Sequence, residues 1–92
     1  MENQFDIDCG GILDISVVAQ WWGQAQIALQ TASLIRFKAN ELQRIDTAGL
    51  QAILALCLAA RKHEIPIQWD SISPALQQAV TLTGLNKLLQ LT

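Results

Sequence analysis

The residues with the clearest chemical potential are those of the run Asp46-Thr47-Ala48-Gly49-Leu50, which precedes the longest apolar helix that the sequence predicts. Thr47 then lies where a loop meets a helix N-terminus. Backbone amides at such an end are unpaired and the helix dipole is positive there, so a phosphate on Thr47 would be held by its own backbone. The pattern therefore indicates a phosphorylatable hydroxyl. It is also typical of a plain N-cap, and the local residues alone favour that simpler interpretation.

Other reactive residues give little support for catalysis. His63 is the single histidine, and its place after Arg61 and Lys62 suits the negative end of a helix better than a general base. No Ser-His-Asp set, Cys-His set or glycine-rich phosphate loop is present in the sequence. We therefore expect a protein that is not an enzyme, with no catalytic residues and no cofactor.

Metal binding and disulfide formation are equally poorly supported. Asp6 and Asp8 lie two residues apart on one predicted strand. Two carboxylates without further ligands on a strand are usually solvated. Cys9 and Cys57 lack metal-ligand spacing and are too few for a disulfide scaffold. We expect no metal site, and two cysteines that are buried as small apolar residues.

Length and composition predict one small soluble domain, residues 1–92. The 92 residues are 51% hydrophobic and 15% charged, which supplies a core and leaves apolar surface for a partner. The net charge is −2 and the basic residues are scattered, so no nucleic-acid surface is expected. Neither a signal peptide nor a membrane span is evident, which predicts a cytoplasmic protein without direct membrane insertion.

Hydrophobic periodicity and turn residues predict alternating strands and helices. The expected strands are 5–9, with 12–15 as a bent continuation, 34–37, 65–69 and a short last strand 88–91. The expected helices run from a Ser16 N-cap to about Thr31, from about Ala48 to His63, and from a Ser73 cap with Pro74 in the first turn to Thr83-Gly84. The order implies right-handed crossovers and a largely parallel α/β sheet.

Two apolar positions are candidate contacts with a partner. In the second helix, Leu50, Ile53, Leu54, Cys57 and Leu58 are expected to face the core. Leu56 and the alanines extend the apolar surface around the cylinder, where burial and a partner contact are both open. In the first helix, Trp22 fits the core stripe with Val18, Ala25 and Leu29, which leaves Trp21 half-buried or in contact with a partner.

The order and spacing of several short motifs resemble the STAS domain, the sulphate-transporter and anti-sigma-factor-antagonist family, over nearly the whole chain. The motifs are Gly11-Ile12-Leu13-Asp14, Leu42, Asp46-Thr47-x-Gly49-Leu50, Ser73-Pro74-Ala75 and Thr83-Gly84-Leu85. The resemblance implies an α/β fold, a STAS-like mixed, largely parallel β-sheet of about four to five strands with α-helices packed on one face. Family members usually have a further strand before Phe5 and a further helix at the end, so the sheet edge here is expected to be less covered.

The resemblance also implies a binding surface. Thr47 takes the place of the phosphorylated residue, and Asp14 is expected on the same face. The partner-binding residues predicted in this way, together with the apolar candidates, are Asp14, Asp46, Thr47, Ala48, Gly49, Leu50, Leu56 and Trp21. Lys38 stands where the family commonly has Asp or Asn. A cation there is expected either to pair with a phosphate on Thr47 or to disturb recognition by the usual kinase.

Three functions follow as alternatives. The first is a phosphorylatable regulator similar to the anti-anti-sigma factors, which captures an anti-sigma or switch kinase until a phosphate on Thr47 breaks the contact. The second is an accessory subunit similar to the cytoplasmic STAS component of phospholipid-trafficking ABC transporters, docked on the ATPase subunit. The third, ranked far below, is a small enzyme or ligand-binding module. A homodimer through the sheet edge is a further expectation.

Overall fold

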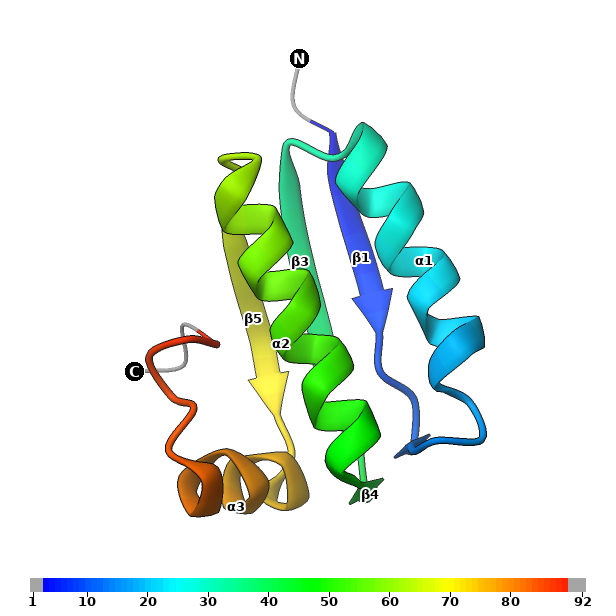
Figure 1. The fold of residues 1–92 in the computed structure, drawn as a ribbon, viewed down its shortest axis with the longest axis vertical. Coiled ribbons are helices and arrows are strands. Elements are labelled where there is room, and N and C mark those ends of the chain that lie inside the picture. The colour runs from blue at the N-terminus through cyan, green and yellow to red at the C-terminus, as the bar shows by residue number, and fades with distance from the viewer. Residues whose placement is uncertain (1–2, 90–92) are drawn as a thin grey trace.

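A parallel sheet flanked on one face by helices forms the body of the protein in a computed structural model that describes residues 3–89 (Figure 1). The strands are β1 (Gln4–Asp8), β2 (Ile12–Leu13), β3 (Leu34–Ala39), β4 (Arg44–Ile45) and β5 (Ile67–Ile72); the helices are α1 (Val18–Thr31), α2 (Thr47–Lys62) and α3 (Pro74–Thr83). The main sheet has the order β1-β3-β5, and its pairs are parallel. The predicted fold class is confirmed.

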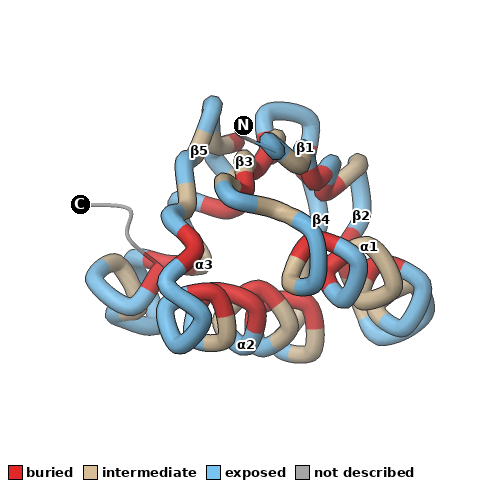
Figure 2. Tube along the Cα trace, turned by 90° about the horizontal axis from the view of Figure 1, so that it is seen from above, coloured by how far each residue is buried: buried red, intermediate tan, exposed pale blue. Residues whose placement is uncertain are grey.

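The central strand β3 shows how the sheet divides core from solvent. Its odd residues Ile35, Phe37 and Ala39 are buried, whereas the even residues between them are only half-buried. Helices α1 and α2 cover the odd face, and Figure 2 shows the buried segments of sheet and helices turned toward each other. The other face of the sheet is polar and carries the Arg36–Asp70 and Lys38–Asp6 ion pairs.

A second, two-stranded parallel sheet lies beyond the end of the main one. Strand β2 pairs with β4, with Ile12 opposite Arg44 and Leu13 opposite Ile45. We expected residues 12–15 to continue the first strand. Residues 12 and 13 instead pair with β4, and a strand of two residues is too short to show a period in the sequence. The small sheet holds the start of α2 beside the loop that leads into α1.

Helix α1 begins later than predicted and is rotated about its axis. It starts at Val18 after an N-terminal residue, Val17, whose side chain makes no capping bond, so Ser16 is not the cap. Its buried residues are Trp21, Ala25 and Ala28, whereas Trp22 is half-buried. Trp21 is only 5% exposed, so its predicted role as a contact residue is wrong. Adjacent helical residues point about 100° apart, so only one of the two tryptophans can face the core, and that residue is Trp21.

Helix α2 is rotated in the same sense relative to the prediction. Its buried face comprises Gly49, Leu50, Ile53, Leu56, Cys57 and Ala60. Leu56 is fully buried and Leu58 is 43% exposed, so Leu56 is a core residue and not an exposed contact. Leu54 is half-buried at the margin of the core. The apolar residues surround this helix, and its sequence alone therefore did not fix which of them faces the sheet.

Helix α3 confirms its predicted boundaries. The Ser73 hydroxyl accepts a hydrogen bond from the Leu76 amide at 3.1 Å, Pro74 occupies the first turn, and Gly84 ends the helix with a left-handed φ of 71°.

The predicted last strand is not formed at residues 88 and 89, which lie in a turn; residues 90 and 91 fall outside the described part. Leu89 is instead buried, and its carbonyl accepts the Trp69 indole N–H at 2.7 Å. None of the helices described has the length and apolar character needed to span a bilayer.

Candidate functional site

Asp46 joins two segments that are far apart in the sequence. One carboxylate oxygen, Oδ1, accepts a hydrogen bond from the Gly49 amide at 2.9 Å and so caps α2. The other, Oδ2, accepts from the Ile15 amide at 3.0 Å, in the loop between β2 and α1. The acid of the Asp-Thr-x-Gly motif is therefore both the helix cap and the link between the two loops that surround Thr47.

Gly49 has a steric role in the same motif. A Cβ atom built on Gly49 would lie 2.1 Å from the carbonyl oxygen of Leu13, a distance that atoms of this kind do not adopt. The first turn of α2 therefore packs directly against the backbone of β2. Only glycine allows this approach, which fixes the position and the rotation of the helix start.

Thr47 is the first residue of α2 and is exposed. Because Asp46 supplies the cap, the Thr47 hydroxyl is not needed for that purpose, and within residues 3–89 it makes no hydrogen bond to protein atoms. The plain N-cap interpretation therefore applies to Asp46, and the hydroxyl of Thr47 remains accessible to solvent beside the positive end of the helix.

Asp14 lies in the loop that Asp46 holds, and it organises the turn into α1. Its carboxylate accepts hydrogen bonds from the Ser16 hydroxyl and from the Ser16 amide, and its carbonyl accepts from the amides of Val17 and Val18. The Ser16 hydroxyl is the main reason that the pKa of Asp14 is lowered from its usual value. Asp14 is thus ionised at neutral pH, in the segment directly before Ile15.

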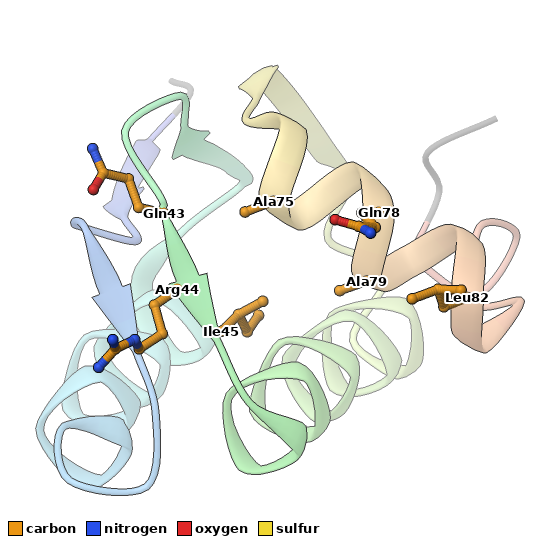
Figure 3. A pocket seen from close by; sticks show the side chains of 7 residues that line it. All are labelled: Gln43, Arg44, Ile45, Ala75, Gln78, Ala79 and Leu82. Carbon is orange, nitrogen blue, oxygen red and sulfur yellow. The ribbon is translucent and has the colours of Figure 1, made fainter.

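A shallow groove runs from Thr47 along the side of α3. Its part nearest Thr47 has a volume of about 310 Å³ and is lined by Ile45, Asp46, Thr47, Leu50, Ala79, Leu82 and Thr83. A neighbouring part of about 300 Å³ shares Ile45, Ala79 and Leu82. In Figure 3 the Ile45 side chain points toward α3, Ala75 and Ala79 lie on the facing helix, and Arg44 points away. The floor of the groove is therefore mainly apolar.

Two strongly exposed apolar side chains lie near the start of α2. Ile15 is 72% exposed and follows Asp14, and Leu82 is 78% exposed at the wall of the groove. Neither residue was predicted from the sequence. Leu82 follows from the phase of α3 once Leu76 and Val80 are known to be buried, whereas no sequence signal placed Ile15 beside Asp46. We call the set Asp14, Ile15, Asp46, Thr47 and Leu82 the signature surface.

The structure separates the remaining predicted residues by burial. Ala48 is half-buried, whereas Gly49 and Leu50 are buried at the base of the site, where Leu50 lines the groove. Trp21 and Leu56 belong to the core and are not part of the signature surface.

Lys38 lies elsewhere, on the polar face of the sheet. Its ammonium pairs with Asp6 Oδ2 at 3.3 Å, on the face opposite the helices, and this position does not support the suggested pairing with a phosphate on Thr47.

Within residues 3–89 no group of three His, Cys, Asp or Glu side chains has the arrangement of a metal site. Burial raises the pKa of Cys9 and of Cys57 to about 12.

Comparison with known proteins agrees with this geometry. The family model described as "Mlab, STAS domain" matches residues 2–90. The chain belongs to the STAS domain family. A crystal structure of a sulfate transporter family protein from Wolinella succinogenes superposes with a TM-score of 0.76 and 16% identity, covering 94% of this chain and 70% of that chain. No curated protein matches the sequence. At this identity the Wolinella structure supports the STAS fold, and the family supports a regulatory or interaction module.

Proposed function

We propose that this STAS domain is a non-enzymatic regulator similar to the anti-anti-sigma factors. In this proposal the signature surface binds an anti-sigma or switch kinase, and phosphorylation of Thr47 releases it. The observation that carries the proposal is the position of Thr47, which is exposed and lines an apolar groove together with the exposed Leu82. Such a patch favours a protein partner, because covering exposed apolar surface removes it from water and lowers the free energy.

The chemistry of the site explains how a phosphate would act as a switch. A phosphate on Thr47 adds roughly −1.5 to −2 charge at pH 7, next to the carboxylates of Asp46 and Asp14. In the free domain, water and the amides at the start of α2 stabilise that charge. In the complex the same charge would have to lose its water against an apolar contact that includes Leu82, which costs binding energy. The modification therefore favours the free domain.

The docking surface can be tested with matched substitutions. We expect Ile15→Ser and Leu82→Ser to weaken binding of a purified partner kinase by roughly tenfold each, because both remove apolar area from the contact. Leu58→Ser is the control, since Leu58 is exposed on α2 but belongs to neither the groove nor the Asp46 loop. Titration calorimetry measures all three. Equal losses for Leu58→Ser and Leu82→Ser would show that the kinase binds another face.

A second candidate is an accessory subunit that docks on the ATPase of a phospholipid-trafficking ABC transporter. The match of residues 2–90 to the model described as "Mlab, STAS domain" favours an interaction module, and the STAS component of such a transporter is the alternative that the family resemblance implied. The same signature surface would then bind the ATPase constitutively, with Thr47 as a contact residue and not as a switch. Co-purification with an ATPase subunit, lost in Leu82→Ser and kept in Leu58→Ser, would support this candidate.

A further inference from the structure

Strand β1 forms an open edge of the main sheet. It pairs with β3 on one side, and within residues 3–89 no strand pairs with its other side. The Cys9 amide donates to the Lys38 carbonyl at 3.0 Å, and the Leu34 amide donates to Asn3, so odd residues of this segment bond to β3. Because alternate residues direct their backbone groups to opposite sides, the amides and carbonyls of Gln4, Asp6 and Asp8 point away from the sheet.

The helix layer extends past this edge. Three strands at about 4.8 Å span roughly 14 Å, whereas two packed helices at about 10 Å each span roughly 20 Å. Both views show α1 lying further out than β1 (Figures 1 and 2). Beneath the edge a shallow groove of about 150 Å³ lies between the end of β1 and α1, lined in part by Asp8, Cys9, Trp21 and Gln24. This groove, which Ile12 and Leu13 of β2 also line, leaves the end of β1 open on the side of α1.

The side chains at the edge define the chemistry of that segment. Asp6 and Asp8 are both exposed, two residues apart, on the polar face of the strand. The Gln4 side-chain amide donates to Asp6 at 2.8 Å, and this bond is the main reason that the pKa of Asp6 is lowered; Lys38 acts in the same direction. Residues on the same face of neighbouring strands lie opposite each other. A strand added beside β1 would therefore place its side chains next to the carboxylates of Asp6 and Asp8.

We propose that the free edge of β1 binds an extended segment of a protein partner that carries Lys or Arg at alternate positions. The segment adds a strand to the sheet through the backbone groups of Gln4, Asp6 and Asp8, and its basic side chains pair with the two carboxylates. Its remaining side chains, on the opposite face, lie toward the groove above α1. A second copy of this chain fits less well, because two β1 strands would place four carboxylates along one shared edge.

The probe is a short acetylated peptide that alternates lysine and valine, titrated into isotope-labelled protein and followed by amide NMR. We expect saturable shifts at Gln4, Asp6 and Asp8. The double substitution Asp6→Asn and Asp8→Asn should weaken binding roughly 2- to 30-fold, from two cross-strand charge pairs. Asp70→Asn is the matched control, because Asp70 lies on the same face of the sheet but on β5, where it pairs with Arg36. This control should bind with unchanged affinity.

Two further peptides separate strand addition from simple charge attraction. The same peptide with glutamate in place of lysine should not bind. A lysine peptide whose alternate amides are N-methylated keeps its charge but loses the donors of a strand, and should also fail to bind. Binding of the methylated peptide, shifts confined to the signature surface, or equal losses for Asp70→Asn and the double variant would overturn the proposal. Concentration-dependent shifts at Gln4, Asp6 and Asp8 without peptide would show that a second copy occupies the edge.

Discussion

At Gly49 the backbone of α2 passes so close to β2 that any side chain would overlap the carbonyl of Leu13. We expect Gly49→Ala to destabilise the domain by about 3 kcal/mol, at the upper end of the range for overpacking, because the contact is backbone and cannot rotate away. Gly23→Ala is the control: a Cβ there meets nothing within 4 Å, and removing glycine from α1 should stabilise the fold by about 0.5 to 1 kcal/mol. Urea unfolding measures both changes, and a neutral Gly49→Ala would contradict the close packing.

Asp46 is the residue on which the geometry of the site depends. We expect Asp46→Ala to cost about 1 to 2 kcal/mol of stability, because the Gly49 amide loses its cap and the Ile15 amide loses its acceptor. The Ile15 amide should also exchange faster with solvent, which hydrogen exchange detects. Thr47→Ala is the comparison, since the Thr47 hydroxyl makes no hydrogen bond within residues 3–89 and its loss should leave stability within about 0.5 kcal/mol. Equal costs for the two variants would mean that Thr47 is the cap.

At the scale of the element, the phase of α2 can be tested by two leucines. We expect Leu56→Ala to lower the free energy of unfolding by about 2 to 5 kcal/mol, because Leu56 is fully buried. Leu58→Ala should change it by less than about 1 kcal/mol, because Leu58 already contacts solvent in the folded state. Chemical denaturation of both variants is sufficient. A larger loss of stability for Leu58→Ala than for Leu56→Ala would support the rotation of α2 that was predicted from the sequence.

The two helices show how far the sequence can predict the structure. The existence of α1 and α2, and the boundaries of α3 with its Ser73 cap, follow from local patterns and were predicted. The rotation of α2 does not, because Leu54, Leu56 and Leu58 are equally apolar. It is set by the bond of Asp46 to the Ile15 amide and by the approach of Gly49 to Leu13, which are contacts with a segment far away in the sequence. The choice between Trp21 and Trp22 failed for the same reason.

The candidate site divides in a similar way. Asp14, Asp46 and Thr47 were predicted as one surface, and the hydrogen bond from Ile15 to Asp46 explains how the segments meet. Ile15 and Leu82 were not predicted, because each is a single apolar residue in an otherwise ordinary segment. The groove exists only where α3 packs beside β4 and the start of α2, which no local pattern reveals.

At the scale of the whole molecule, the two thiols report on global unfolding. Burial raises the pKa of Cys9 and Cys57 from 9.0 to about 12, which means that the folded state keeps both protonated where the unfolded chain would not. This stabilisation is complete below pH 9 and is lost as the pH rises from 9 toward 12, by about 1.4 kcal/mol per pH unit for each thiol. Denaturation at several alkaline pH values measures it. Replacing both cysteines by alanine should remove this part of the pH dependence, and an unchanged profile would contradict it.

The proposed regulation depends on whether a phosphate on Thr47 controls the signature surface. The direct measurement is a titration of one purified partner kinase against the unmodified domain and against the domain phosphorylated at Thr47. We predict that phosphorylation weakens the complex by roughly tenfold or more, because the added charge must be desolvated beside Asp46 and the apolar groove. The domain itself should remain folded in both forms. Equal affinities would contradict the switch and would leave a constitutive docking subunit as the function of this surface.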